Sequence, residues 1–449
     1  MAAPRLCHIY ITLVLLSHSL VTTSALDVDD DILDDIVFQS GNQRTLKVGP
    51  AKPRRFLLYD VNHGEGFNLR RDVYMRIANL VRRLQENGDW VLVLPPWGRL
   101  YHWRTRSLEQ VRIPWATFFD VESLNRYIPV IEFEEFVKET GRPAIDQILY
   151  LQAYKEGWTN GKWEEKIDER ECIEPPAYRP DEQGLYRGWF WGYSDAYARA
   201  FKCLSVQGMA RILAPILLKN YTARSIFVDR GEKVHHDHFG NSDYWTARRS
   251  MRFAKHLRDI GDDFRETKLG STDRKDKTEM TEDWRDMKRK PGSAVGGPYL
   301  AAHLRREDFA RNNRKEVPSL ESAAEQMKVA LTKHKLKKVF VATDAPKHEI
   351  ETLRRHLQDF EVYNYVPPKG VLENFKDGGV AIIDQWICAH ARYFIGTGVS
   401  TFSFRIHEER QILGFDTKMT YNRFCGNGEP EDCEQPSIWK IVQHPSTGN

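Results

Sequence analysis

Short apolar runs alternate with stretches of helical periodicity along most of this chain, and this alternation restricts the fold more than any other feature of the sequence. An apolar run followed by apolar side chains at intervals of three and four residues is typical of the strand–helix units of an α/β fold. The first helix is predicted around Val73, Ile77, Leu80 and Leu84. The predicted strands are residues 56–59, 91–94, 226–228, 299–304, 338–342 and 393–395.

Two such series predict two doubly wound domains that face each other, with a ligand in the crevice at the strand ends. The 449 residues suffice for two or three domains. Residues 255–290 are densely charged and poor in apolar side chains, so we expect a surface helix followed by a mobile loop there. We divide the chain into a signal peptide at residues 1–25, an N-terminal Rossmann-like domain at 26–245 and a C-terminal Rossmann-like domain at 246–449.

The first segment of the chain has the pattern of a secretory signal peptide. Arg5 is basic, residues 9–16 are apolar, and Thr23-Ser24-Ala25 form a small-residue cleavage site. The apolar run is shorter than the roughly 20 residues that span a bilayer, although an uncleaved anchor is the alternative. No later segment is apolar enough for a second span, so we expect a soluble lumenal or secreted chain. The sequon at residues 220–222 predicts N-glycosylation of Asn220, which suits that compartment.

The charge of the chain is nearly balanced, with 66 Lys and Arg against 63 Asp and Glu and a formal net charge of +3. Proteins that bind nucleic acids normally carry a basic stripe or a basic domain. We therefore expect no nucleic-acid partner. An anionic ligand should instead meet a few placed arginine or histidine side chains.

Six cysteines are present, and five stay after Cys7 leaves with the signal peptide. An oxidising compartment favours disulfides, and an odd count leaves one thiol over. Cys388 lies in an apolar run and is the expected buried thiol. The expected bridges are Cys172–Cys203 and Cys425–Cys433.

The loop at residues 60–72 leaves a predicted strand and enters a predicted helix, the position at which open α/β sheets bind ligands. Gly64 and Gly66 flank Glu65, so the backbone can approach a ligand closely while the carboxylate is unobstructed. One interpretation makes Glu65 a general base and the following amides phosphate donors. The other is a solvated glutamate in an ordinary loop.

The strand predicted at residues 299–304 carries a compact group of basic residues at its end. His303 and Arg305 point to the same face, because side chains alternate along a strand with a period of two. The planar guanidinium of Arg305 suits bidentate binding of phosphate. The alternative is a structural salt bridge between Arg305 and Asp308 or another carboxylate.

Residues 393–402 join a predicted strand to two glycines and then to hydroxyl residues, which is what a phosphate cradle requires. Ser400, Thr401 and the free amides around them would donate hydrogen bonds. The alternative is an ordinary glycine-rich turn. No lysine follows as in a Walker loop, and Thr401 replaces the last glycine of the dinucleotide fingerprint.

One acidic residue, Asp384, interrupts an apolar helical face within residues 377–391. A buried carboxylate is costly unless it is paired. Asp384 therefore either pairs with an arginine or accepts hydrogen bonds from a ligand, for which the N–H edge of a guanine is suited.

Two other clusters resemble metal sites without meeting their geometry. Residues 235–238, His-His-Asp-His, are adjacent along the chain, and adjacent side chains seldom converge on one ion. The acidic residues 27–31 lie in the leader and do not follow a strand. We therefore expect no metal.

Taken together, these segments resemble the GDP-fucose protein O-fucosyltransferases, and among them the branch that acts on thrombospondin type 1 repeats. The resemblance runs through essentially the whole mature chain. One departure is His63-Gly64, which stands where that pattern has Pro-Pro and predicts a looser loop before Glu65. The segments that carry the resemblance are Asn62 with residues 65–72, and residues 90–103, 187–193, 303–309, 377–391, 400–404 and 421–425.

The resemblance implies an α/β fold of the GT-B type, with GDP-fucose in the cleft between two Rossmann-like domains and an inverting, metal-independent transfer of fucose. The N-terminal domain then carries the catalytic base Glu65 and the acceptor side, and the C-terminal domain binds GDP-fucose. Arg305 is the implied catalytic ligand of the pyrophosphate. The other implied substrate contacts are Gly64, Gly66, Phe67, Asn68, Leu69, His303, Asp308, Asp384, Ser400, Thr401 and Phe402.

The resemblance also implies the partners and the compartment. The donor is GDP-fucose, the acceptor is a Ser or Thr hydroxyl of a folded thrombospondin type 1 repeat, and no cofactor is needed. A monomer in the lumen of the endoplasmic reticulum is expected, although the sequence has no Lys-Asp-Glu-Leu type tetrapeptide. The alternatives are a non-catalytic lumenal chaperone or sugar-nucleotide binder of the same fold, and an O-fucosyltransferase for another repeat type.

Overall fold

The computed structural model describes residues 53–103, 105–157, 162–313, 315–398, 400–430 and 432–435. The predicted signal peptide at residues 1–25, the acidic residues 27–31 and the start of the predicted N-terminal domain lie outside these residues. Among the helices of the described part, none has the length and apolar character needed to cross a membrane.

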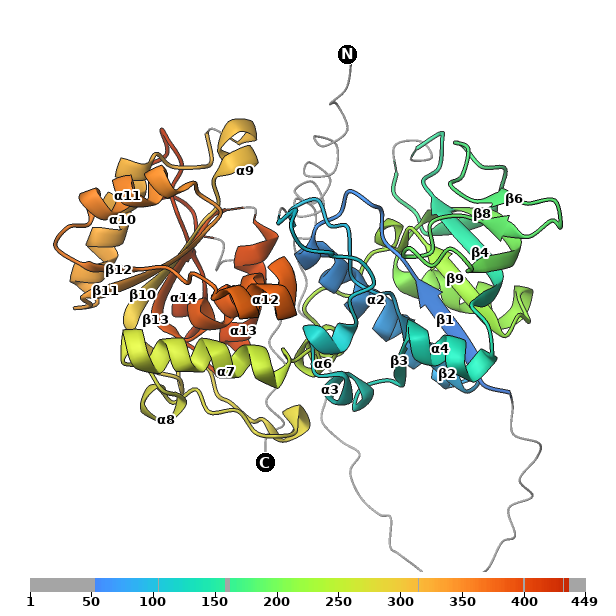
Figure 1. Ribbon diagram of the computed structural model, residues 1–449, viewed down its shortest axis with the longest axis horizontal. Coiled ribbons are helices and arrows are strands. Elements are labelled where there is room, and N and C mark those ends of the chain that lie inside the picture. Colours follow the sequence, from blue (N-terminus) through green and yellow to red (C-terminus); the bar gives the residue numbers. More distant parts are fainter. Residues whose placement is uncertain are drawn as a thin grey trace, which may run out of the picture. The chain divides into compact units, whose positions relative to one another are not determined.

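The first half of the described chain forms a nine-stranded sheet in which β3, β2, β1, β9, β4 and β8 are neighbours in that order and pair in parallel (Figure 1). Three short strands extend it with antiparallel pairing at the β8 side. The strands are β1 (Arg55–Tyr59), β2 (Trp90–Leu94), β3 (Val130–Glu132), β4 (Ala144–Gln152), β5 (Lys166–Glu169), β6 (Arg179–Pro180), β7 (Tyr186–Arg187), β8 (Tyr197–Gln207) and β9 (Ser225–Asp229).

The central strands are continuous apolar runs because both faces of the sheet are covered. All five residues of β2 are buried, as are residues 56–59 of β1. Helix α2 buries Val73, Ile77 and Leu80 completely, which confirms the helix predicted from their spacing. The helices of this half are α2 (Phe67–Gln85), η1 (Trp115–Thr117), α3 (Val121–Asn125), α4 (Phe133–Thr140), η3 (Ala210–Ile212), α5 (Leu213–Pro215), η4 (Ile216–Asn220), η5 (Gly231–Lys233) and α6 (Ser242–Ser250).

The second half forms a five-stranded sheet in the order β12, β11, β10, β13, β14, with parallel pairing throughout. The strands are β10 (Gly297–Leu304), β11 (Lys338–Thr343), β12 (Glu361–Tyr363), β13 (Ala391–Gly396) and β14 (Asn422–Arg423). The helices are α7 (Lys255–Phe264), η6 (Arg265–Leu269), α8 (Asp273–Asp276), η7 (Trp284–Asp286), α9 (Glu307–Asn312), α10 (Leu320–Lys333), α11 (Lys347–His356), α12 (Lys369–Ala389), α13 (Thr401–Leu413) and α14 (Thr417–Thr420). All six predicted strands are therefore present. The predicted domain division at residue 246 stays a prediction.

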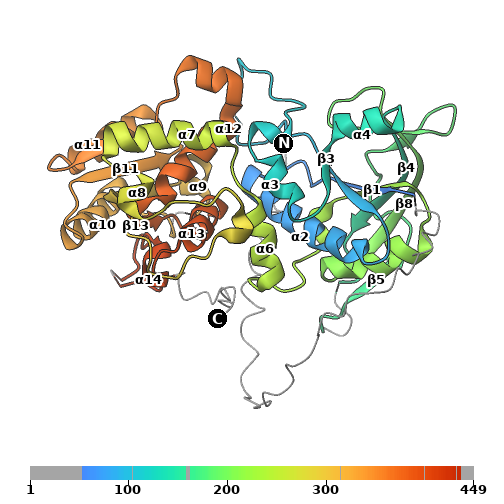
Figure 2. The same ribbon diagram turned by 90° about the horizontal axis from the view of Figure 1, so that it is seen from below.

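Helix α7 lies beside α12, as Figures 1 and 2 both show. Gly261 of α7 makes this approach possible, because a Cβ at that position would lie 2.6 Å from Cδ1 of Trp386. The indole of Trp386 donates to Oδ1 of Asp262 at 2.7 Å, so the two helices are joined by a hydrogen bond as well as by packing.

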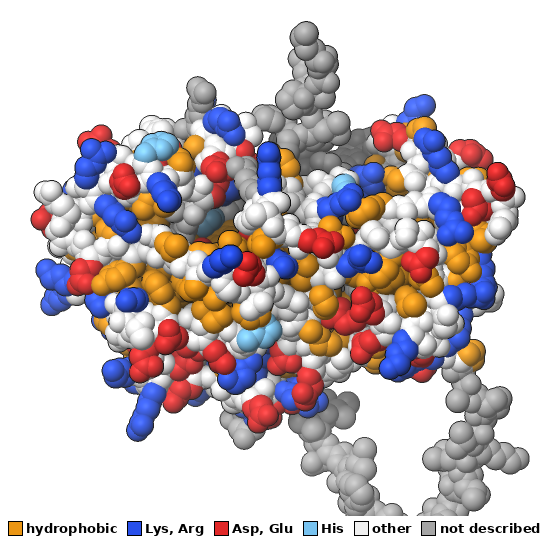
Figure 3. Space-filling view, in the orientation of Figure 1, with side chains coloured by type: hydrophobic (Ala, Val, Ile, Leu, Met, Phe, Trp, Pro, Cys, Tyr) orange, Lys and Arg blue, Asp and Glu red, His pale blue; other side chains and the backbone are white. Residues whose placement is uncertain are grey.

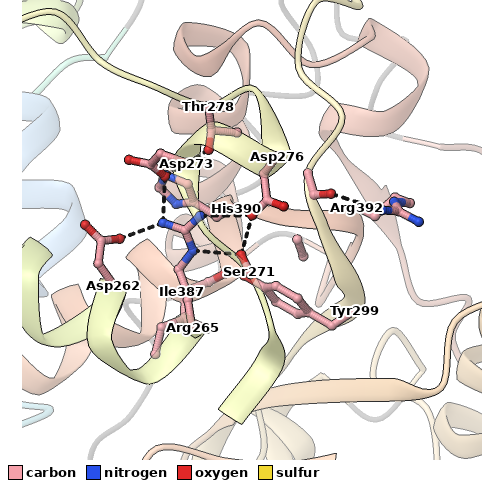
Figure 4. A network of polar contacts seen from close by, with 12 residues as sticks. Asp262, Arg265, Ser271, Asp273, Asp276, Thr278, Tyr299, Ile387, His390 and Arg392 are labelled. Atoms are coloured by element: carbon pink, nitrogen blue, oxygen red, sulfur yellow. Dashed lines mark hydrogen bonds and ion pairs between the residues drawn. The ribbon is translucent and has the colours of Figure 1, made fainter. Parts of the chain in front are cut away.

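The charged stretch at residues 255–290 begins with the predicted surface helix, α7, but differs from the mobile loop predicted after it, because Arg265 lies inside the protein (Figure 4). Arg265 is 1% exposed. Its guanidinium donates to Asp262 at 2.6 Å and Asp273 at 2.8 Å, and to Asp276 and Ser271 at 3.2 Å each. Charged side chains that satisfy one another can be buried, so a charge-rich composition does not identify a surface loop.

Both predicted disulfides, Cys172–Cys203 and Cys425–Cys433, are present, and Cys388 is a free, buried thiol as expected. Asn220 is exposed at the end of η4. Its glycosylation stays a prediction.

Charges of both signs are interspersed over most of the face shown in Figure 3. This matches the nearly balanced totals of 66 basic and 63 acidic residues. That face therefore offers a polyanion no continuous basic area among the described residues.

The Arg265 cluster generates a test of stability. Arg265→Met should lower the free energy of unfolding by about 3–5 kcal/mol, because it leaves the buried carboxylate of Asp276 and the partly exposed carboxylates of Asp262 and Asp273 without their cation. Arg285→Met is the matched control, since the Arg285 side chain is 57% exposed and pairs with Asp283 near the surface. Its effect on the free energy of unfolding should be much smaller, because exposed ion pairs contribute little. Equal losses for the two variants in denaturant titrations would contradict the structural role of Arg265.

Candidate functional site

Each parallel sheet has a position at which the chain order reverses, and ligands of open α/β sheets bind at the carboxyl ends of strands at such positions. In the first sheet this position lies between β1 and β9, and in the second between β10 and β13. The loop that carries Glu65 follows β1. Arg305 follows β10, and Ser400 and Thr401 follow β13. The predicted residues therefore occupy the two ligand positions that the topology offers.

Glu65 is partly buried, and its backbone amide donates to the carbonyl of Asn62 at 2.9 Å. Burial raises the pKa of its carboxyl group, and the nearby carboxylate of Glu232 raises it further. Arg70, Lys233 and Arg76 act in the opposite direction. A carboxylate whose proton affinity is increased in this way is suited to general-base chemistry.

The glycines on either side of Glu65 differ in their surroundings. A Cβ at residue 66 would lie 3.1 Å from Cδ2 of His102, whereas a Cβ at residue 64 would have no heavy atom within 4 Å. Gly66 therefore permits the close approach of a histidine from another loop. The space beside Gly64 is open to a ligand.

The side chains of Phe67 and Asn68, at the start of α2, face inward, so their contact with a substrate, which stays a prediction, would involve their backbone amides. The ring of Phe67 is buried, with its centroid 4.8 Å from that of Trp97. The side chain of Asn68 is buried and accepts hydrogen bonds from Arg71 and Gln385. Only the first amides of the helix, including that of Leu69, are left for a ligand.

His303 lies at the end of β10, where it pairs with Gly396 of β13. Its Nδ1 is 2.8 Å from Oγ of Ser403, and its ring stacks on Phe402 at a centroid distance of 4.3 Å. Burial, assisted by the charge of Arg305, lowers the pKa of His303 to about 3, so the imidazole is neutral. His303 is therefore a neutral hydrogen-bonding group.

Arg305 forms the salt bridges that were the alternative to a phosphate contact. Its guanidinium pairs with Asp308 at 2.7 Å and with Asp344, and its Nη2 lies 3.3 Å from Nδ1 of His102. Its backbone amide donates to the hydroxyl of Thr397 at 2.9 Å. These contacts hold the planar fork in one orientation without excluding a phosphate, because the side chain is still 17% exposed.

Helix α13 begins beside this arginine. Ser400 is its N-cap and is buried, Thr401 is exposed, and Phe402 lies against His303. The amides at the start of a helix attract anions. Gly396 serves packing, because a Cβ there would lie 2.6 Å from Oγ of Ser403.

Asp384 lies on α12, and of the two alternatives left open for it, an arginine partner is absent among the described residues. Its Oδ1 is buried without a hydrogen-bond partner in that part of the chain. Burial raises the pKa of Asp384 to about 8. The hydroxyl of Tyr365 is also buried without a hydrogen-bond partner among the described residues, and burial, together with the charge of Asp384, raises the pKa of Tyr365 to about 12. An orphaned buried carboxyl oxygen of this kind suits a ligand with N–H donors.

Carboxylates close enough to share a cation occur at Glu307, Asp308 and Asp344 in the described residues. The guanidinium of Arg305 already lies between Asp308 and Asp344, so the positive charge there comes from the chain itself. Two members of residues 235–238 have different partners: His236 contacts Asp72 at 3.1 Å, and Asp237 pairs with Arg83 at 3.3 Å.

His102 and Asp344 were missed in the sequence. Asp344 directly follows β11, the neighbour of β10, so its position at a strand end was an available signal. His102 lies in an irregular loop without such a signal. It contacts Arg305 and lies against Gly66, so the predicted base and the predicted anion ligand have a common neighbour.

Comparisons with known proteins show which family this chain resembles. The family model of GDP-fucose protein O-fucosyltransferase matches residues 56–413. GDP-fucose protein O-fucosyltransferase 2 of Homo sapiens is 59% identical over 394 residues, covering 88% of this chain and 91% of that protein. The Caenorhabditis elegans protein of the same name is 48% identical over 400 residues, covering 87% and 91%.

Among solved structures, the crystal structure of POFUT1 in complex with GDP-fucose aligns with a TM-score of 0.56 at 15% identity, covering 83% of this chain and 98% of that one. This likeness concerns the fold, and it confirms the expected α/β fold of the GT-B type. From the match of the family model and the identity to these relatives, it follows that the chain belongs to the GDP-fucose protein O-fucosyltransferase family of enzymes.

Proposed function

We propose that this protein transfers fucose from GDP-fucose to a Ser or Thr hydroxyl of folded thrombospondin type 1 repeats, with inversion at the sugar carbon and without a metal. The observation that carries the proposal is the arrangement around His102. A partly buried carboxylate with a raised pKa, Glu65, and a fixed guanidinium, Arg305, lie on loops that both contact this residue. Family membership supports the same reaction.

In the proposed reaction the acceptor oxygen bonds to carbon-1 of fucose while the bond from carbon-1 to the phosphate oxygen breaks. Glu65 removes the hydroxyl proton, and the bonding electrons leave with GDP. Arg305 and the first amides of α13 stabilise the charge that grows on the diphosphate. His303, Ser400, Thr401 and Phe402 shape the same surface.

The base of the nucleotide is proposed to contact Asp384. The buried oxygen of Asp384 has no partner among the described residues, and guanine presents adjacent N–H donors. Donation to the ionised carboxylate would compensate for its burial.

Independence from metal is supported by the position of Arg305 between Asp308 and Asp344, where a divalent cation would meet a resident positive charge. Residence in the lumen of the endoplasmic reticulum as a monomer is part of the proposal. The two disulfides support an oxidising compartment.

The direct test is transfer of labelled fucose from GDP-fucose to a panel of purified acceptors. We expect labelling of folded thrombospondin type 1 repeats, none of the same repeats after reduction and none of epidermal-growth-factor-like repeats. EDTA should leave the rate unchanged. Loss of transfer with EDTA that manganese restores would contradict metal independence, and labelling of the other repeat type would contradict the proposed acceptor.

A second test separates catalysis from binding. Glu65→Gln should slow transfer by about 10²–10⁴-fold, the usual share of a general base. The affinity for GDP should barely change, because the base acts in the transition state. Arg305→Ala should weaken GDP binding by roughly 1.5–3 kcal/mol and slow transfer as well, because it removes a charge-assisted contact. Titration calorimetry measures the GDP affinity of the two variants, and the transfer assay measures their rates. Transfer by Glu65→Gln at the wild-type rate would remove the base role.

A third test concerns Asp384. Because burial raises its pKa to about 8, its carboxyl group is mostly protonated at pH 7 without ligand. Guanine N–H donors favour the ionised form, so GDP binding should release a proton at pH 7 and tighten as the pH rises towards 8. Asp384→Asn should weaken binding and abolish that part of the proton release. Calorimetry in two buffers of different ionisation enthalpy measures how many protons are released when GDP binds to the wild type and to Asp384→Asn. Identical proton release by the two proteins would contradict the guanine contact.

A further inference from the structure

The loop between β1 and α2 is held by one arginine. Arg70 donates to Oδ1 of Asp60 at 3.0 Å and to three backbone carbonyls, those of Val61 at 3.3 Å, Asn62 at 3.2 Å and Glu65 at 3.2 Å. The Arg70 side chain is 12% exposed, so these bonds are largely shielded from water. A single guanidinium therefore fixes the backbone on both sides of residues 63 and 64.

A second side chain holds the same loop from the neighbouring strand. Oε2 of Glu232 accepts the amide of Asn62 at 3.0 Å, and the carbonyl of Asn62 accepts the amide of Glu65 at 2.9 Å. Glu232 belongs to η5, the turn after β9, and the amide of Gly231 in that turn donates to the carbonyl of Asp60 at 2.8 Å. The turn that follows β1 is thus joined to the turn that follows β9 by two hydrogen bonds.

These contacts supply the rigidity that the residues before Glu65 lack. His63 and Gly64 are exposed, and no heavy atom would meet a Cβ at residue 64 within 4 Å. Packing therefore does not hold the tip of the loop, so its conformation depends on the hydrogen bonds at its two ends.

We propose that Arg70 and Glu232 are positioning residues for Glu65: Arg70 fixes the backbone of the loop, and Glu232 anchors Asn62, whose carbonyl accepts the amide of Glu65. This inference rests on the proposed function, in which Glu65 removes the proton of the acceptor. Neither residue touches the reacting atoms.

The charged and titratable groups near Glu65 come from four elements. Glu232 and Lys233 lie on η5 and Arg70 and Arg76 on α2, while His63 belongs to the loop itself. His102 lies against Gly66 from the loop that also contacts Arg305. After burial, Glu232 is the largest contribution that raises the pKa of Glu65, and Arg70, Lys233 and Arg76 lower it. Removal of the Glu232 charge should therefore make Glu65 a weaker base that ionises at lower pH.

The first variant is Arg70→Lys, which keeps the charge but cannot reach four acceptors with one ammonium group. We expect kcat to fall by about 10–10²-fold, since a small misplacement of a reacting group has effects of that size. The KM for GDP-fucose and the affinity for GDP should stay as in the wild type, because in the proposed function the nucleotide is held by Arg305, the start of α13 and Asp384.

The second variant is Glu232→Gln, whose amide oxygen can still accept from Asn62 while the charge is lost. We expect the acidic limb of the pH profile of kcat/KM to move to lower pH, which a merely structural role would not produce. The matched controls are Glu139→Gln and Arg126→Lys, members of exposed ion pairs outside the site, which should keep the wild-type rate and profile.

The outcomes separate this inference from the function on which it rests. If the wild type transfers fucose and Glu65→Gln does not, but Arg70→Lys has the wild-type kcat or Glu232→Gln has the wild-type acidic limb, the inference alone is overturned. A fall in kcat of Arg70→Lys accompanied by weaker GDP binding or a lower unfolding midpoint would indicate a general structural role and would also overturn it. Absence of transfer by the wild type would remove the proposed function itself.

Discussion

The buried contact between α2 and α12 is the interaction on which the geometry of the site depends most. Arg71 is fully buried and donates to Gln385 at 2.7 Å, and Gln385 donates in turn to Asn68 at 2.8 Å. Helix α2 begins directly after Glu65, and Gln385 is adjacent to Asp384. The contact therefore fixes the helix behind the proposed base against the helix behind the proposed nucleotide contact. A polar contact of this kind has a defined geometry that apolar packing alone would not impose.

The strands, helix α2 and the loops of Glu65 and Arg305 could be predicted because their signals are local. Neighbouring residues alone determine an apolar run such as residues 91–94 and the periodicity of α2. The ligand positions then follow from the rule that open α/β sheets bind ligands at the carboxyl ends of their strands. The loop of Glu65 and the end of β10 lie where that rule requires. The family resemblance, carried by long residue patterns, is confirmed by the match over residues 56–413.

Contacts between residues far apart in sequence could not be predicted. Glu232 holds Asn62 across 170 positions, and His102 meets Arg305 across 203. Neither pairing produces a periodic pattern in the sequence.

The burial of Arg265 could not be predicted for a related reason. The composition of its segment is that of a solvated loop, and its burial is favourable because three carboxylates converge on it in the folded structure. The expected ligand contacts of Phe67 and Asn68 stay predictions, and because both side chains are buried their backbone amides would have to meet the ligand.

Buried charges in this protein follow two different rules. The guanidinium of Arg265 has hydrogen-bond partners for all its nitrogens, and its neighbours are themselves bonded, so the cluster stabilises the fold without needing a ligand. Asp384 has a buried oxygen without any partner in the described residues, and an unsatisfied polar atom costs about 1–3 kcal/mol. Arg305 is intermediate, because its carboxylate partners hold it in place while leaving it partly accessible. Recognition of a nucleoside diphosphate calls for both kinds of group: an oriented but accessible charge such as Arg305, and a buried, unpaired carboxyl group such as Asp384. Arg305 can attract the phosphates from water. The carboxyl group of Asp384 is stabilised when an N–H donor of the base replaces the hydrogen bonds to water that burial has removed.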